Sequence, residues 1–331
     1  MPDISLLAPK VLNGVIEELQ FPDTFLGLSL IGTPEDNPFP VAEWDVIGTS
    51  RAMAQPGVPN TEAKIVSRLG VGKRTASFLY LREKKIFKPT TLHWLREPGT
   101  LATKNAERAV MREIQDLDRR FAAFAEWTIW QMLSGVLSLN YADVIAEVDY
   151  ALALSHTPVV AEPWSDAGAA DVIGDIFAWK LLISEDGAGG SPRLIVLNST
   201  TMNDVVQNES IHTFFSDRMK DSYLTTQTVP GLLGLEWRVY DSVYDSGSGA
   251  EKYVPDGVAI LIADNPERPF FLMQGPSADH SAPTGHVGRF AKSWLEEDPS
   301  ARQYLEEWHF LPILERPDQI VYAHVDGSSA A

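Results

Sequence analysis

The strongest pattern in the sequence is a stripe of apolar residues at helical spacing between positions 103 and 139. Val110, Ile114, Leu117, Phe121 and Phe124 follow one another at intervals of four and three residues, and charged residues fill the opposite side. The stripe predicts a helix of about 30 residues, which would be roughly 45 Å long. Because the average helix is about a third of that length, we expect it to form the backbone of a large, flat or extended domain.

Strand-like and helical patterns on both sides of this helix predict a mixed chain of helices and strands. Alternating strands are expected at 41–50, around Phe78–Leu81, after Gly135, and on both sides of a Ser-Gly-Ser-Gly turn. The other expected elements are a short helix at about 10–20, a second helix at 167–183 capped by Ser165 or Asp166, a buried strand at 193–199, an amphipathic helix opening with a threonine cap at 200–218, an acidic helix at 293–308 and closing strands at 309–325.

Residues 41–90 differ from the rest of the chain in composition and in the pattern of apolar positions. They hold few residues that could form a core of their own, so we interpret them as a long β-hairpin or excursion that lies against something else. A basic cluster falls in this segment, although the chain as a whole is acidic. The cluster consists of Lys64, Arg68, Lys73, Arg74, Arg82, Lys84, Lys85 and Lys88.

Composition narrows the classes of function. The chain has 331 residues, with 27 Lys and Arg against 45 Asp and Glu, a net charge of −18, and no cysteine. This length suggests about two domains. The missing cysteines exclude disulfides, cysteine-based zinc sites, iron–sulfur clusters and thiol nucleophiles. The acidic balance argues against a free-standing nucleic-acid binder and against an anionic membrane surface as partner. No signal peptide and no membrane span are indicated.

No segment of the sequence gives a strong signal for catalysis, phosphate binding or metal binding. The segment GVGKRT at 70–75 resembles a phosphate-binding loop, but Arg74 stands where Ser or Thr is needed. His280 and His286 share a loop and are more often plain surface residues than metal ligands. The carboxylate pairs Glu296–Glu297 and Glu306–Glu307 are interpreted as the solvated face of the acidic helix. Nine tryptophans are typical of core or interface anchors.

The order of these parts resembles the major capsid proteins of tailed bacteriophages, the family of the lambda capsid protein E. An N-terminal arm, a long β-excursion and a long spine helix at about 104–137 follow one another, and SGVLSLNY resembles the passage into the next strands. YVPDGVAILIAD resembles the family's Pro-Asp strand entry, with Pro255 and Asp256 in place. FLPILERPDQIVYAHV resembles its closing strands, with Pro312, Pro317, Asp318 and Val321 in place.

The resemblance implies an α+β fold, that of the Hong Kong phage capsid shell. Its regions would be an N-terminal arm (1–40), an extended loop (41–90), a peripheral domain with the spine helix (91–191), an axial domain (192–300) and a return to the peripheral domain (301–331). Arm and loop would lie on adjacent subunits. Subunits would form hexamers and pentamers of an icosahedral shell that encloses double-stranded DNA without sequence-specific binding.

The resemblance also implies partners, a location and a set of contacts. No cofactor, metal or catalytic residue is expected. Scaffolding, decoration and portal proteins would be further partners, and the protein would be found in the virion after assembly in the host cytoplasm. The basic excursion would meet acidic surface on a neighbouring copy. The expected intersubunit contacts are Trp44, Arg51, Lys64, Arg68, Lys73, Arg74, Arg82, Lys84 and Lys85.

Two alternatives stay open at the level of sequence. One is a cellular nanocompartment shell with the same fold. The other is a soluble α/β enzyme, for instance a hydrolase that uses the carboxylates of Asp241 and Glu251 or the loop of His280 and His286.

Overall fold

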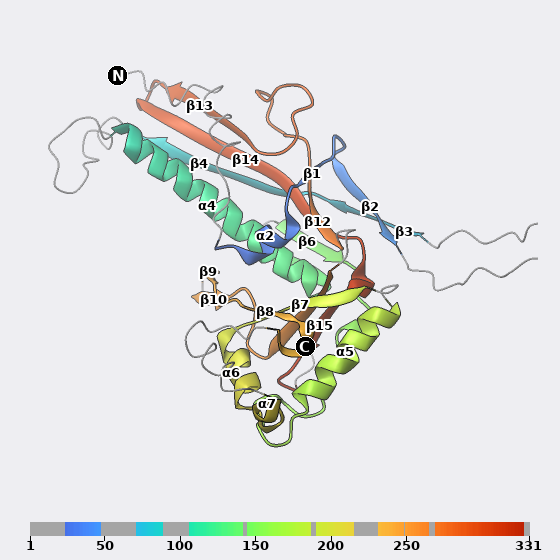
Figure 1. Ribbon diagram of the computed structural model, residues 1–331. Helices are drawn as coiled ribbons and strands as arrows, with labels where there is room; N and C mark the ends of the chain where they lie inside the picture. The colour runs from blue at the N-terminus through green and yellow to red at the C-terminus, as the bar shows by residue number, and fades with distance from the viewer. Residues whose placement is uncertain are drawn as a thin grey trace, which may run out of the picture. The chain divides into compact units, whose positions relative to one another are not determined.

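The computed structural model describes residues 24–47, 71–88, 106–141, 144–186, 190–214, 231–247, 249–264 and 269–327 (Figure 1). The chain divides into two compact units, which are described separately. Unit 1 comprises Met1–Ala42, Thr75–Ile129 and Phe271–Pro312; unit 2 comprises Glu43–Arg74, Trp130–Phe270 and Ile313–Ala331. The expected division into arm, loop, peripheral and axial regions concerns parts of a shell and stays a prediction.

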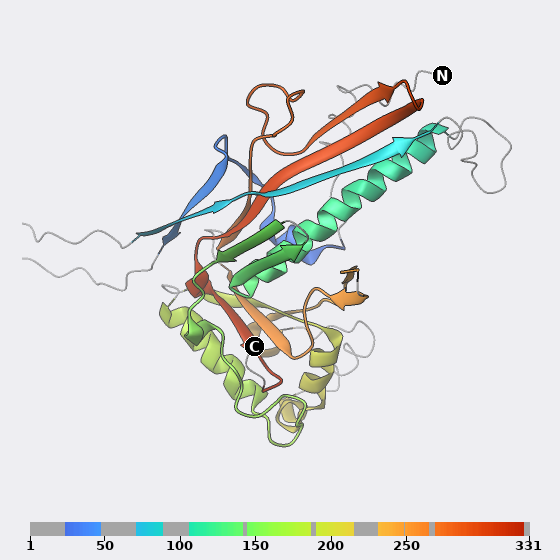
Figure 2. The same cartoon turned by 180° about the vertical axis from the view of Figure 1, so that it is seen from behind.

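Unit 1 is built on a sheet whose central strand is the 14-residue β14 (Figure 2). Antiparallel neighbours β13 and β4 lie on either side of it, and β12 continues the sheet to β1. The long helix α4 runs along this sheet. The elements of the unit are α2 (Leu26–Ile31), β1 (Glu35–Asp36), β4 (Leu79–Phe87), α4 (Ala106–Leu133), β12 (Phe270–Gln274), β13 (Phe290–Glu296) and β14 (Ala301–Leu314).

The sequence pattern locates α4 correctly. Its predicted apolar stripe is buried from Val110 to Phe121, and Phe124 lies edge-on to Phe310 of β14, with ring centroids 6.2 Å apart. The helix ends just before Gly135, whose φ of 96° belongs to the left-handed region that favours glycine. A side chain at Gly135 would also come within 2.8 Å of Leu152. The predicted helix at about 104–137 is therefore confirmed as 106–133.

The acidic helix expected at 293–308 is wrong. Strands β13 and β14 occupy this segment and pair antiparallel, with Phe290 opposite Glu307 and Glu296 opposite Ala301. Acidic residues have low intrinsic strand propensity, but pairing and burial override that preference. Nearly every residue of β14 is buried because both faces of the strand are covered, so its sequence lacks the polar–apolar alternation of a half-exposed strand.

Unit 2 is built on a four-stranded sheet in the order β15-β11-β7-β8. β11 is antiparallel to β7 and β15, and β8 is parallel to β7. Ile195, Leu197, Leu261 and Val321 share one face of the sheet and form a buried core with the helices. The elements are α5 (Val172–Asp186), β7 (Ser191–Leu197), α6 (Ser199–Gln207), α7 (Glu209–Phe214), β8 (Glu236–Val239), β11 (Val258–Asp264) and β15 (Ile320–His324).

Shorter elements complete the described chain. Three two-stranded ribbons are β2 (Val41–Ile47) with β3 (Val71–Ser77), β5 (Val136–Tyr141) with β6 (Val144–Asp149), and β9 (Val243–Asp245) with β10 (Ala250–Lys252). Single 3₁₀ turns are η3 (Leu154–His156), η4 (Leu232–Gly234) and η5 (Pro317–Gln319). Within the described residues, no helix is both long enough and apolar enough to cross a membrane. The short helix expected at 10–20 lies outside the described residues.

Two predicted helix starts need correction. α5 begins at Val172 rather than at 167, and Asp171 accepts a hydrogen bond from the Gly174 amide at 3.0 Å. Asp166 instead holds the preceding turn, accepting from the amides of residues 168 and 169. The helix expected at 200–218 is two helices, and the cap of the first is Asn198, whose side chain accepts from Thr201 N at 2.9 Å. Local capping by Asx residues explains both shifts.

Candidate assembly surfaces and buried polar networks

Strand β4 contains Arg82, Lys84 and Lys85 of the predicted basic cluster. Because side chains alternate along a strand, neighbouring cations lie on opposite faces of the sheet. On one face, the Arg82 guanidinium reaches Asp279 in the loop at 275–289 between β12 and β13, and the Tyr80 hydroxyl reaches Glu307 of β14. On the other face, Lys85 reaches α4, where its ammonium lies 2.7 Å from carboxylate oxygens of both Glu113 and Asp116. Arg82 and Lys85 therefore have acidic partners within their own chain.

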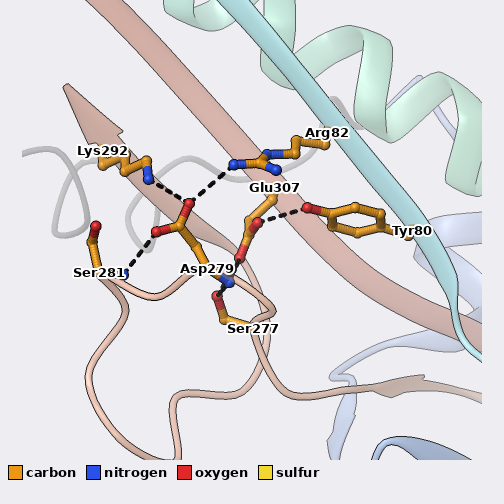
Figure 3. A network of polar contacts seen from close by, with 7 residues as sticks. All are labelled: Tyr80, Arg82, Ser277, Asp279, Ser281, Lys292 and Glu307. Carbon is orange, nitrogen blue, oxygen red and sulfur yellow. Dashed lines mark hydrogen bonds and ion pairs between the residues drawn. The ribbon is translucent and has the colours of Figure 1, made fainter. Parts of the chain in front are cut away.

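The 275–289 loop is fixed to the sheet by two buried carboxylates (Figure 3). Asp279, with a side chain 2% exposed, pairs with Lys292 at 2.5 Å and Arg82 at 3.2 Å, and accepts from the Ser281 amide at 2.8 Å. Burial would raise the pKa of Asp279, but the hydrogen bonds from Lys292 and Ser281 outweigh it and hold this pKa below its ordinary value of 3.8.

Glu307 of β14 is the second carboxylate. It accepts hydrogen bonds from the Tyr80 hydroxyl at 3.1 Å, from the Asp279 amide at 3.1 Å and from the Ser277 hydroxyl. Burial, followed by the charge of Glu307, raises the pKa of Tyr80 to about 12. Glu307 thus ties the base of the loop and strand β4 to the central strand of the sheet.

The neighbouring residue, Glu306, faces the opposite side and makes a second network with α4. Glu306 is 0% exposed and accepts from Arg289 at 2.5 Å and from the Tyr304 hydroxyl at 3.1 Å. Arg289 also pairs with Asp118 of α4 and lies 5.8 Å from the ring of Trp308. The interpretation of Glu306 and Glu307 as a solvated face is wrong, because both are buried and hydrogen-bonded.

One signal in the sequence could have shown this strand. Tyr304, Glu306, Trp308 and Phe310 recur at every second position, as the residues of one strand face do. Glu306 interrupts the apolar character of that series, and its partners Asp118 and Arg289 are far away in the sequence. A buried carboxylate with distant partners leaves no local motif.

A third buried carboxylate, Glu126 of α4, holds helix α2. Its two oxygens each accept a backbone hydrogen bond at 2.8 Å, one from Gly27 and one from Leu28, at the start of α2. Carboxylates are favourable at helix N-termini because the first amides have no partner within the helix. A side chain at Gly27 would come within 2.9 Å of the carboxylate, so glycine at this position lets the carboxylate approach without being displaced. Residues 26–31 of the predicted arm therefore pack on their own chain.

The remaining predicted contact residues differ in their burial and in their partners. Trp44 is buried within unit 2 and lies 6.2 Å from Tyr150, measured between ring centroids. Lys73 pairs with Glu43 at 2.6 Å, and Arg74 donates to the Asp149 carbonyl at 2.6 Å. Arg51, Lys64 and Arg68 lie outside the described residues. Lys84 is exposed on β4 and has no ion pair with any residue that the structure describes. An intersubunit role of these residues stays a prediction.

The first Pro-Asp motif has a structural role in unit 2. The Asp256 carboxylate accepts from the Asn198 side chain at 2.6 Å and pairs with Lys252 at 2.6 Å. The hydrogen bond from Lys252 is the main reason that the pKa of Asp256 lies below its ordinary value. Asn198 in turn caps α6. The motif therefore links the entry of β11 to the start of α6.

The residues of the enzyme alternative do not come together in a reactive site. Asp241 accepts from the Ser199 amide at 2.8 Å, while Glu251 accepts from Tyr244 at 2.8 Å and Ser246 at 2.6 Å in the β9–β10 ribbon. His286 contacts the Arg289 carbonyl at 2.9 Å. Among the residues that the structure describes, no group of three or more His, Asp or Glu side chains is arranged to hold a metal ion.

Comparison with protein families decides the relationship. The family model for phage major capsid protein E matches residues 9–325. The chain belongs to this family. A search of curated proteins finds no significant match.

Solved structures of two capsid proteins and of one phage-related protein share the fold of this family member at low sequence identity. A prophage capsid protein of E. coli CFT073 has a TM-score of 0.67 at 15% identity, covering 96% of this chain and 99% of its own. A phage-related protein of Bordetella bronchiseptica RB50 has a TM-score of 0.60 at 14% identity, covering 98% and 99%. The capsid of cyanophage P-SCSP1u has a TM-score of 0.55 at 9% identity, covering 88% and 86%. The predicted α+β capsid fold is confirmed.

Family membership also fixes the function at a coarse level. The protein is a structural major capsid protein of a phage, it forms homo-oligomeric shells, and its place is the virion. The capsid family has a structural rather than an enzymatic role.

Proposed function

We propose that this capsid protein assembles into hexamers and pentamers, which close an icosahedral shell around double-stranded DNA. The match of the capsid family model over residues 9–325 carries the proposal. The net charge of −18 supports enclosure rather than binding of the DNA, because phosphate contacts need Lys and Arg. Assembly takes place in the host cytoplasm, with scaffolding, decoration and portal proteins as further partners.

Within this shell, the regions have the roles expected from the resemblance. Residues 1–40 form the arm, 41–90 the extended loop, 91–191 and 301–331 the peripheral domain, and 192–300 the axial domain. The basic excursion contributes the contacts between copies. Lys84 is the sharpest candidate among its described residues, because it is exposed while its neighbour Lys85 is held by Glu113 and Asp116.

Assembly of the purified full chain tests this function. The protein is expressed alone and together with neighbouring phage head genes, then examined by size-exclusion chromatography and negative-stain electron microscopy over a range of salt concentrations. Rings of five and six subunits, or closed shells, are the expected result. A stable monomer under every condition would contradict the proposal. Nuclease protection of DNA in particles made during infection tests whether the shell encloses the genome. We expect the protected DNA to show no sequence preference.

A further inference from the structure

Helix α5 carries large apolar residues on the face that packs on its own chain and also on the face that does not. Val172, Ile176, Trp179 and Ile183 are buried in the core of unit 2. On the outside, Phe177 is 54% exposed and Leu181 is 59% exposed. These two residues are four positions apart and therefore adjacent on the helix surface. Exposed Ala178 lies beside them, and we call these three residues the α5 outer face.

A solvated helix in the same chain looks different. The exposed positions of α4 include Arg112, Asp116, Arg119 and Arg120, which are all charged. Apolar side chains that adjoin on a surface can mark a contact with another molecule. The three residues of the α5 outer face are uncharged, but two charged groups lie beside them. The Lys180 ammonium donates to the Leu233 carbonyl at 2.7 Å and lies 5.8 Å from the centroid of the Phe177 ring, and Glu185, four residues after Leu181, is exposed. The α5 outer face thus exposes apolar side chains where α4 presents charged ones to solvent.

We infer that the α5 outer face packs against a second copy of this chain. The inference rests on the proposed function, in which each subunit is surrounded by copies of itself. These apolar side chains, with the exposed carboxylate of Glu185 one turn further on, do not suit DNA, which binds through cations. A second copy does offer matching surface, because unit 2 also exposes Ile145, Leu154 and Val243, with Leu154 91% exposed. A closed ring joins two different surfaces of neighbouring subunits, so the partner surface lies outside α5.

The absence of cysteine makes a direct test possible. L181C introduces the only thiol in the chain, and A178C is a second variant with a smaller change of side chain. T284C, at an exposed position of the 275–289 loop, provides the reference rate. N-ethylmaleimide labelling is measured on assembled particles and on dissociated subunits. Relative to T284C, we expect labelling at 181 and 178 to be at least tenfold slower in particles. Equal rates in particles and subunits would overturn the inference.

The identity of the covering surface needs a second measurement. A benzophenone maleimide attached to the thiol of the L181C variant is activated by light in particles made from equal parts of ¹⁵N-labelled and unlabelled subunits. Cross-linked peptides that combine heavy and light chains, with the second peptide outside 172–186, are the expected result. Cross-links confined to one chain, or to another co-purified protein, would contradict a second copy as occupant.

Failure of the inference and failure of the proposed function give different results. If wild type and both variants remain monomers, the proposed function fails and the inference falls with it. If particles form and the thiol of L181C reacts as fast in them as in free subunits, only the inference about α5 fails.

Discussion

Helices α4 and α5 each bury an apolar face, but the side chains on their other faces differ. Those of α4 include charged residues that pair within the chain, whereas those of α5 include exposed apolar residues. The outer side chains of α4 find ionic partners in the same chain: Glu113 and Asp116 pair with Lys85, and Arg120 pairs with Glu83 at 2.9 Å. The outer face of α5 presents Phe177 and Leu181. The first arrangement is complete within one subunit, whereas the second gains stability only when another surface excludes water from it.

This difference separates two kinds of substitution. Changes along α4 remove contacts that a single subunit already makes, so they should lower the free energy of unfolding of the free subunit. Changes on the α5 outer face remove little that the free subunit has beyond the contact of the Lys180 ammonium with the Phe177 ring, so they should act mainly on assembly. The following substitutions test this contrast, beginning with the largest expected effect.

The largest loss is expected for R289M. Methionine retains much of the length of arginine but leaves the buried carboxylates of Asp118 and Glu306 without their shared cation. Removing one partner of a buried ion pair typically costs about 3–5 kcal/mol. Urea denaturation of dissociated subunits measures the effect. Q115A, at an exposed position of α4, is the matched control and should change stability by less than about 0.5 kcal/mol. A loss for R289M no larger than for Q115A would show that the network is dispensable.

E126A should follow, because it removes the acceptor of two backbone amides. Each buried N–H left without an acceptor costs about 1–3 kcal/mol. Hydrogen exchange at the amides of Gly27 and Leu28 should speed up more than exchange within α4. E126Q keeps one amide oxygen as an acceptor and should lie between wild type and E126A. Unchanged exchange at residues 27 and 28 in E126A would mean that the carboxylate does not hold α2.

The sequence predicts α4 well because its stability depends on a local, repeated pattern. The buried stripe from Val110 to Phe124 lies within one segment, and so does the glycine that ends it. The β13–β14 pair could not be predicted in the same way. Its acidic residues Glu306 and Glu307 are tolerated in a buried strand only because Arg289, Tyr80 and Ser277 come to them from other segments. Their partners are set by tertiary structure, which leaves no local pattern.

The predicted intersubunit contact residues show the same limit of prediction from sequence. A count of cations identifies 64–88 as a basic segment, but it does not tell which lysine is already paired. The register of β4 against β14 settles this for two neighbours. Lys85 lies opposite Tyr304 and faces α4, whereas Lys84 lies opposite Leu305 on the other side of the sheet. The burial of Trp44 against its own chain was equally invisible in the sequence.

Lys85 and Lys84 therefore form a matched pair of smaller effect. K85A should lower the stability of the free subunit by about 0.5–1 kcal/mol, the usual range for partly exposed ion pairs. K84A should leave subunit stability unchanged and weaken assembly, as seen by size-exclusion chromatography. If K84A assembles like wild type, the proposed contact role of Lys84 is wrong. A loss of stability in K84A equal to that in K85A would remove the distinction between the two faces of β4.

The effect of K85A should also depend on pH. The hydrogen bond from Lys85 lowers the pKa of Asp116 below its ordinary value of 3.8. Desolvation would lower the pKa of Lys85, but the hydrogen bonds to Asp116 and Glu113 outweigh it and raise this pKa above 10.5. The lowered carboxyl pKa gives stability that is present above about pH 4 and is lost as the pH falls further. The raised lysine pKa gives stability that is present below about pH 10.5 and is lost above it. The difference between wild type and K85A should therefore shrink below pH 4.

A small effect on the free subunit is also expected for F177S/L181S on the α5 outer face. Both residues are already more than half exposed, so we expect a change in unfolding free energy within about 0.5 kcal/mol. Covering the exposed half of each side chain contributes about 1 kcal/mol. Losing both contributions at each contact corresponds to a rise of at least about tenfold in the subunit concentration needed for assembly. Light scattering across a concentration series measures this threshold. The opposite result would be a less stable F177S/L181S subunit that assembles at the same subunit concentration as wild type. It would mean that α5, like α4, makes its contacts within one chain.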